Sequence, residues 1–270
     1  MIIGFDAKRI VRNATGLGNY GRTLVNDLAA VVPDDWTLRL YAPDAGRDTL
    51  RSQVKETQRL RFVYPQHWPG GIGRSLWRIG PIVRDLKRDG VGLYHGLTGE
   101  LPVGISKSGI SSVVTIHDLI FLRHPEYYHQ TDVTIYKWKF HQTVREADRI
   151  IAISERTKHD IMELGGVAAD RIDVIYQSCS PRYATAVSPQ QADEVRCRYQ
   201  LPGRFILSVG SIEARKNIAE AVKALNYLPE DIHLVAVGKP TEYAEQVLRS
   251  ISRPALASRV RFLHNVPDAD

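Results

Sequence analysis

The stretch RFILSVGSIEARKNIAEAV, residues 204–222, passes from an apolar run through a glycine and a short loop into a segment with helical character. The part up to Gly210 has the β-branched and aromatic residues of a strand, and the part from Lys216 onward predicts a helix. A strand that leads directly into a helix is the repeating unit of a parallel sheet wound with helices on both sides. The stretch therefore predicts an α/β fold.

The same unit recurs along the chain. We predict strands over residues 1–6, 36–42, 59–65, 91–97, 111–119, 148–154, 171–178, 204–210, 232–238 and 259–266. We predict helices over residues 18–32, 73–90, 127–147, 155–164, 188–199, 216–227 and 241–252. Pro81 is expected to bend the second of these helices. The alternation predicts doubly wound, mainly parallel sheets.

The sequence pattern of alternating strands and helices is interrupted after residue 180. Residues 181–203 contain three of the prolines and lack a buried-strand pattern, which is typical of a linker. We therefore expect a first domain over 1–180 and the start of a second over 204–270. The second has only about three predicted strands, whereas such sheets commonly have about five or six, so we interpret it as incomplete or unusually small. A sheet of that size exposes an edge, and we predict self-association through 204–270.

Composition limits the partners. The chain has 270 residues and a net charge of +6, which favours anionic ligands. Its aromatic residues are not interleaved with a basic run, so we expect a small phosphorylated ligand rather than nucleic acid. The two cysteines, Cys179 and Cys197, form no disulfide framework or metal motif. Without a signal peptide or spanning segment, we expect a cytoplasmic protein with at most peripheral membrane contact.

Candidate ligand-binding residues follow the strands, because doubly wound sheets bind ligands at the carboxyl ends of their strands. Gly16 and Gly18 in the loop 12–21 fit a glycine spacing that brings backbone close to an anion, although a flexible loop capped by a helix explains them equally well. The strand 36–42 has no acidic residue at its tip, which argues against an NAD site.

Two histidines also follow predicted strands. A lone histidine is more often structural, and this is the favoured interpretation of His95. His117 is paired with Asp118 directly after a buried strand, which favours a functional role. Arg215 and Lys216 lie where a helix is expected to begin, and cations there oppose the helix dipole unless an anion is bound. They are either solvated charges or a diphosphate site.

Together the motifs GLGNYGRTL, TIHDL, ADRIIAISERTKHDI and VGSIEARKN resemble the retaining nucleotide-sugar glycosyltransferases of family 4. This resemblance covers nearly the whole chain. It implies the GT-B architecture of two Rossmann-like domains, with the acceptor on the first and the nucleoside diphosphate of the donor on the second. The implied activity is transfer of a hexose to a glycan or lipid-linked acceptor with retention of configuration. No metal or other cofactor is expected, and the nucleotide sugar is a substrate.

The resemblance also assigns residues. It implies catalytic roles for His117 and Asp118 and acceptor contacts for Asn19, Tyr20 and His95. The residues that it implies for binding the donor diphosphate are Gly16, Gly18, Gly210, Arg215 and Lys216.

Two departures from the family pattern leave an alternative open. Ser211 stands where members often have arginine, and the family's paired glutamates would lie beyond residue 266. The alternative hypothesis is a truncated, non-catalytic transferase that acts as a binding module. A phosphorylase or a sugar-nucleotide epimerase fits the architecture less well.

Overall fold

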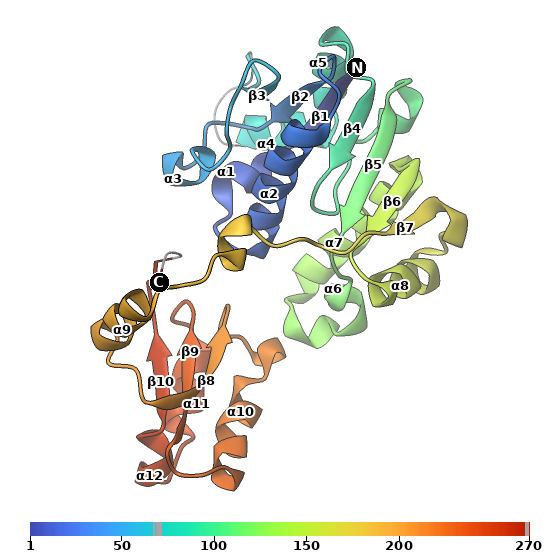
Figure 1. The fold of residues 1–270 in the computed structure, drawn as a ribbon. Helices are drawn as coiled ribbons and strands as arrows, with labels where there is room; N and C mark the ends of the chain where they lie inside the picture. The colour runs from blue at the N-terminus through green and yellow to red at the C-terminus, as the bar shows by residue number, and fades with distance from the viewer. Residues whose placement is uncertain (67, 69–71, 268–269) are drawn as a thin grey trace. The chain divides into compact units, whose positions relative to one another are not determined.

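The chain folds into two compact units, Met1–Ser180 and Pro181–Asp270. A computed structural model describes every residue except 67, 69–71 and 268–269 (Figure 1). Each unit contains its own parallel sheet and its own apolar core. The α/β class predicted from the sequence is confirmed.

The first unit is built on a seven-stranded sheet in the order β3-β2-β1-β4-β5-β6-β7, with all neighbours parallel. The strands are β1 (Ile2–Asp6), β2 (Thr37–Tyr41), β3 (Leu60–Val63), β4 (Leu93–Gly96), β5 (Ser111–Ile116), β6 (Arg149–Ala152) and β7 (Ile172–Val174). The α-helices are α1 (Lys8–Arg12), α2 (Gly16–Val31), α3 (Asp48–Arg51), α4 (Ile72–Ile79), α5 (Ile82–Arg88), α6 (Ile120–Arg123), α7 (Gln130–Glu146) and α8 (Glu155–Gly165). The strand order reverses between β1 and β4, so the loops that follow these two strands diverge at the carboxyl edge.

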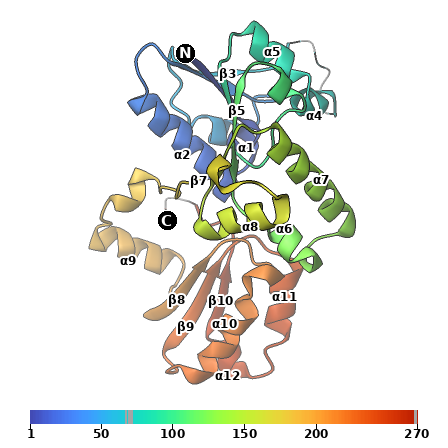
Figure 2. The same ribbon diagram turned by 90° about the vertical axis from the view of Figure 1, so that its right-hand side faces the viewer.

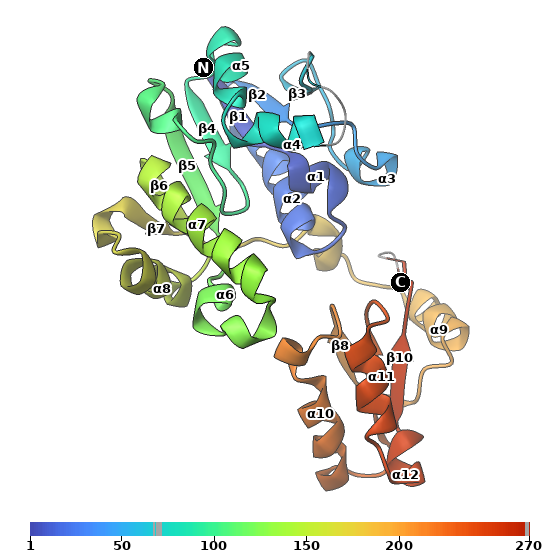
Figure 3. The same ribbon diagram turned by 180° about the vertical axis from the view of Figure 1, so that it is seen from behind.

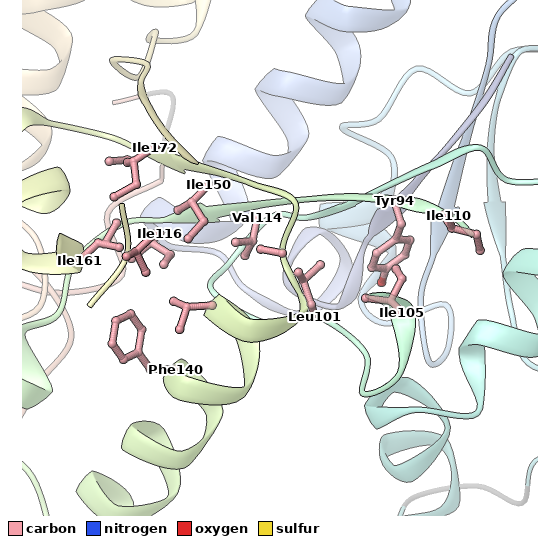
Figure 4. Close-up of a cluster of buried hydrophobic side chains, with 14 of the residues drawn as sticks. Tyr94, Leu101, Ile105, Ile110, Val114, Ile116, Phe140, Ile150, Ile161 and Ile172 are labelled. Carbon is pink, nitrogen blue, oxygen red and sulfur yellow. The ribbon is translucent and has the colours of Figure 1, made fainter. Parts of the chain in front are cut away.

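Apolar side chains cover both faces of this sheet. On one face α4, α5, α7 and α8 contribute Trp77, Leu86, Phe140 and Ile161, and α4 and α7 lie on the same side of the sheet (Figure 3). Figure 4 shows Phe140 and Ile161 beside Ile116 of β5. A separate cluster joins α1 and α2 to β1 and β2. Because β5 has helices on both sides, its run of apolar residues is that of a central strand, as predicted.

Some local predictions for the first unit differ from the structure. The predicted helix over 73–90 is two helices, α4 and α5, separated by Gly80 and Pro81. Pro81 occupies the N-cap of α5 and has no N–H to continue α4. Helix α1 was not predicted, because its five residues are too few to show a helical period.

The second unit has a three-stranded parallel sheet in the order β10-β9-β8 (Figure 2). Its strands are β8 (Arg204–Val209), β9 (Ile232–Val237) and β10 (Val260–Leu263), and its α-helices are α9 (Pro189–Arg198), α10 (Ile218–Ala224), α11 (Glu242–Arg249) and α12 (Pro254–Ala257). Ser188 and Gln191 form a capping box at the start of α9, which explains why the helix begins there. In the core, Leu234 and Ala236 of β9 belong to one apolar cluster with Leu225 and residues of the helices.

Strand β8 lies at an edge of this sheet and pairs only with β9 in the part of the chain that the structure describes. Ile206 and Leu207 point to opposite faces of the strand, and both side chains are exposed. Val209 is 74% exposed. In the first unit, β1 has the equivalent place in the order β3-β2-β1 but pairs on its other side with β4. Within the described residues, the outer edge of β8 is therefore apolar and has no neighbouring strand.

No helix in the described part of the chain is both long enough and apolar enough to cross a membrane.

Candidate active site

A cavity of about 260 Å³ lies at the carboxyl edge of the first unit's sheet. The loops after β1, β4 and β5 meet there, beside the reversal of strand order where doubly wound sheets bind ligands. The lining side chains are Arg9, Leu17, Thr98, Glu100, Ile116, His117, Asp118, Leu119, Phe121, Tyr128, Tyr136, Lys139 and Phe140, with Gly99 between two of them. Of the predicted site residues, His117 and Asp118 belong to this set.

His117 follows β5 directly and is held from several sides. Its Nε2 lies 3.0 Å from the carbonyl oxygen of Leu97, which can only accept, so we assign the proton to this nitrogen. Its Nδ1 lies 2.7 Å from the side-chain amide nitrogen of Gln177, which donates. The ring of Tyr20 meets the imidazole edge to face, with centroids 4.8 Å apart. Burial lowers the pKa of His117 below its ordinary value, so the neutral Nε2–H tautomer fits all these contacts.

These contacts limit what His117 can do. Since both ring nitrogens are engaged, the imidazole can reach a ligand hydroxyl only if that hydroxyl replaces Leu97 or Gln177 as its partner. Asp118 is exposed, and its Oδ1 accepts a hydrogen bond from the backbone N–H of Ile120 at 3.3 Å. The cavity thus combines a neutral imidazole with an accessible carboxylate.

His95 lies inside β4, is buried and does not line the cavity. Its Nε2 is 2.8 Å from the hydroxyl of Thr115, which is 3.0 Å from the hydroxyl of Tyr20. Burial lowers the pKa of His95 to about 4, so this histidine is neutral at physiological pH. The amide oxygen of Asn19 accepts a hydrogen bond from the guanidinium of Arg22. Asn19, Tyr20 and His95 therefore all have partners within the first unit.

The predicted glycine loop is partly helical. Gly16 and Gly18 lie in the first turn of α2, and Leu17 between them lines the cavity. A Cβ on Gly18 would come 1.8 Å from the backbone oxygen of Asn13, so no side chain fits there. A Cβ on Gly16 would meet no heavy atom within 4 Å. Backbone packing accounts for Gly18, and contact of either glycine with a diphosphate stays a prediction.

A chain of ion pairs that was not predicted from the sequence runs beside the cavity. Arg78 of α4 lies 2.6 Å from Asp6 at the end of β1 and also pairs with Glu100. Glu100 in turn lies 2.9 Å from the ammonium group of Lys139 on α7. Burial alone would raise the pKa of Glu100, but Arg78 and Lys139 outweigh it and lower that pKa to about 2. These residues are distant in sequence. Only Asp6 lies at the end of a predicted strand, so only Asp6 could have been expected near the site from the sequence.

The predicted diphosphate residues lie in the second unit. Gly210 follows β8 with a φ of 142°, which favours glycine. Arg215 and Lys216 belong to a short 3₁₀ turn, Ala214–Lys216. Nε of Arg215 lies 2.7 Å from the carboxylate of Glu213, and Lys216 is exposed.

The helix that follows begins later than predicted. Asn217 has a left-handed conformation with a φ of 52°, which asparagine tolerates better than most residues, and α10 starts at Ile218. The predicted helix is therefore present, and its start at residue 216 was placed two residues too early. The two cations precede the helix instead of occupying its first turn.

The family and the sequence relatives that match this chain are glycosyltransferases. Residues 14–182 match Glycosyltransferase Family 4. The O-antigen chain mannosyltransferase B of Escherichia coli is 27% identical over 296 residues, an alignment that covers 100% of this chain and 72% of that protein. The O-antigen chain mannosyltransferase RfbU of Salmonella typhimurium is 22% identical over 58% of this chain and 40% of that protein.

Solved structures share the fold. Anabaena HepE in complex with UDP and glucose superimposes with a TM-score of 0.65 and 20% identity, over 97% of this chain and 68% of that chain. A glycosyltransferase from Rickettsia africae gives a TM-score of 0.68 and 14% identity, over 99% of this chain and 68% of that chain. These similarities confirm the predicted GT-B type of fold with two Rossmann-like units.

Proposed function

Because this chain belongs to Glycosyltransferase Family 4, we propose that it transfers a hexose from a nucleotide-diphosphate sugar to a glycan or lipid-linked acceptor, with retention of anomeric configuration. The observation that carries the proposal is the cavity beside the β1–β4 reversal, which collects His117, Asp118, Glu100 and Lys139 within the family-matched region. Mannose is the proposed sugar, because the relatives named above are mannosyltransferases.

The first unit has the polar groups that a sugar requires. In the proposed reaction, one sugar hydroxyl replaces Gln177 as the hydrogen-bond donor to Nδ1 of His117. The exposed carboxylate of Asp118 accepts a hydrogen bond from a second hydroxyl of the same sugar. Tyr128 and Tyr136 line the same cavity, and we propose that an aromatic ring there packs against the apolar side of the sugar ring.

The second unit supplies the donor side of the proposal. Breaking the bond between sugar and phosphate creates negative charge on the leaving diphosphate, and fixed cations stabilise that charge most in the transition state. Lys216 is exposed, and Arg215 lies within the same turn after β8. We assign this leaving-group role to these two residues and propose a reaction that needs no metal, so that a chelator should leave turnover unchanged.

The first experiment is calorimetric titration of the chain with UDP and with GDP. Binding of one nucleotide that is lost in Lys216→Ala supports the proposed donor site. Lys223→Ala is the matched control, because Lys223 is an exposed lysine of the same unit that pairs with Glu220. Absence of binding to both nucleotides, or equal binding by Lys216→Ala and the control, would count against it.

Turnover is the second readout. GDP-mannose is the donor to test first, with a mannose-containing glycan as acceptor. We expect His117→Ala to lower turnover and to leave nucleotide binding intact, because His117 belongs to the first unit and the proposed diphosphate contacts belong to the second.

A further inference from the structure

His117 has one degree of freedom that its hydrogen bonds do not fix. Its backbone is held, because its carbonyl oxygen accepts a hydrogen bond from the hydroxyl of Thr157 on α8 at 3.1 Å. Its ring bonds to Leu97 at one nitrogen and to Gln177 at the other. Two contacts at the two nitrogens leave the ring free to tilt about the line that joins these atoms. A third contact is needed to fix the plane of the imidazole.

Tyr20 of α2 supplies this third contact. Its ring is nearly perpendicular to the imidazole of His117, with an interplanar angle of 87° and centroids 4.8 Å apart. Aromatic pairs prefer this edge-to-face arrangement. A contact between whole rings opposes the tilt that the two hydrogen bonds allow.

The hydroxyl of Tyr20 is anchored to the sheet. It lies 3.0 Å from the hydroxyl of Thr115, which is fully buried, and that hydroxyl lies 2.8 Å from Nε2 of His95. Thr115 precedes His117 by two residues, and side chains two residues apart along a strand point to the same face. Thr115 therefore holds the hydroxyl end of Tyr20 on the side of the sheet where His117 lies.

Packing covers only part of the Tyr20 ring. Tyr20 is half-buried and also lines a second cavity of about 280 Å³, whose walls include Leu24 of α2 and Ile175 after β7. An aromatic ring that borders open space can turn into that space unless another contact holds it. The hydrogen bond to Thr115 therefore keeps Tyr20 against His117.

We propose that Tyr20 is a positioning residue that sets the orientation of the His117 imidazole, and that Thr115 and His95 act through Tyr20. In the proposed function a sugar hydroxyl replaces Gln177 at Nδ1 of His117, so one hydrogen bond of the ring changes partner. The Tyr20 contact is not exchanged, and the ring keeps its orientation during this change. The benefit to turnover rests on the proposed function, whereas the contact itself does not.

The first test is nitrogen NMR of the full chain without nucleotide or acceptor, at a pH well above the pKa of histidine. Loss of signals in His117→Gln assigns those of His117. A ring held as one tautomer by Leu97 and Gln177 gives well-separated signals for its two nitrogens, and exchange between tautomers brings these signals together. We expect this convergence in Tyr20→Leu, because a tilted imidazole loses its alignment with both partners.

Turnover is the second test. We expect Tyr20→Leu to lower kcat about tenfold with little change in the KM for the acceptor, because an aromatic pair has an interaction energy of that order. Tyr20→Phe and Thr115→Val should each lower kcat about threefold, and the double variant should do no more, since both break the same hydrogen bond. Tyr41→Phe is the matched control, because it removes a tyrosine hydroxyl that donates to Asp89 elsewhere in the same unit.

Three results would overturn the proposal. The first is an unchanged pair of His117 nitrogen signals in folded Tyr20→Leu. The second is a higher acceptor KM at unchanged kcat, which would identify Tyr20 as an acceptor contact. The third is additive effects of Tyr20→Phe and Thr115→Val.

Two controls keep these results distinct. If circular dichroism shows that Tyr20→Leu is unfolded, Tyr20→Phe and Thr115→Val provide both the NMR and the turnover measurements. Absence of turnover in the unaltered chain would count against the proposed function alone, because the NMR samples contain neither nucleotide nor acceptor and still report whether Tyr20 orients His117.

Discussion

The side-chain amide nitrogen of Gln177 lies 2.7 Å from Nδ1 of His117, so a residue after β7 fixes the imidazole at the end of β5. Gln177→Glu places a carboxylate at this nitrogen, which stabilises the protonated ring and should raise the pKa of His117. Gln177→Ala removes the partner without adding charge. Nitrogen NMR of the histidines across a pH titration reports tautomer and pKa directly. An unchanged His117 titration in Gln177→Glu would show that the contact is not formed in solution.

The buried His95 should make the first unit sensitive to acid. Its pKa is about 4 in the folded state and about 6.5 when unfolded, so between these values only the unfolded chain takes up the proton. Stability should therefore fall by about 1.4 kcal/mol per pH unit as the pH drops from about 6.5 towards 4. His95→Gln should flatten this dependence. Urea unfolding followed by tryptophan fluorescence reports on the first unit alone, because all four tryptophans lie in it.

The two glycines at the start of α2 should respond in opposite directions to alanine. In Gly18→Ala the new Cβ would meet the backbone oxygen of Asn13 at 1.8 Å, and the clash should destabilise the first unit by about 1–3 kcal/mol or more. In Gly16→Ala the Cβ enters open space at a helical position, which should stabilise the unit by about 0.4–1 kcal/mol. The same unfolding assay compares the pair, and equal effects would contradict the close approach at Gly18.

The uncovered edge of β8 should cause self-association. Ile206, Leu207 and Val209 are exposed on a strand whose outer N–H and C=O groups can pair with another chain. We expect sedimentation velocity at tens of micromolar to show association that Val209→Lys suppresses. Val187→Lys is the matched control, because Val187 is an exposed valine outside the sheet. A monomer at that concentration would contradict the prediction.

The sequence predicted the alternating elements well, because each strand of a doubly wound sheet is an apolar run and each main helix has a periodic apolar face. The shortest elements were not predictable, since α1 and α3 have too few residues to show a period. The end of the helix at Gly80 was also misjudged, because a proline can bend a helix or end it, and the surrounding packing decides between the two outcomes.

For the candidate site, position after a strand was a sufficient signal for His117 and Asp118, which both line the cavity. Gln177, Glu100 and Arg78 could not be found in this way, because they come from segments that only the folded chain brings together. The start of α10 depended on the left-handed conformation of Asn217, which no periodicity reveals.

The ion pairs of Glu100 with Arg78 and Lys139 have a consequence for any ligand that enters the cavity. Dehydration of Glu100 and alignment of its charge are completed when the chain folds, so ligand binding does not require these groups to reorganise. A ligand that competes for Lys139 must replace an existing partner, whereas one that fits between the fixed charges meets an electric field already in place. The wall of the cavity therefore discriminates by the arrangement of charge on a ligand and not simply by its size.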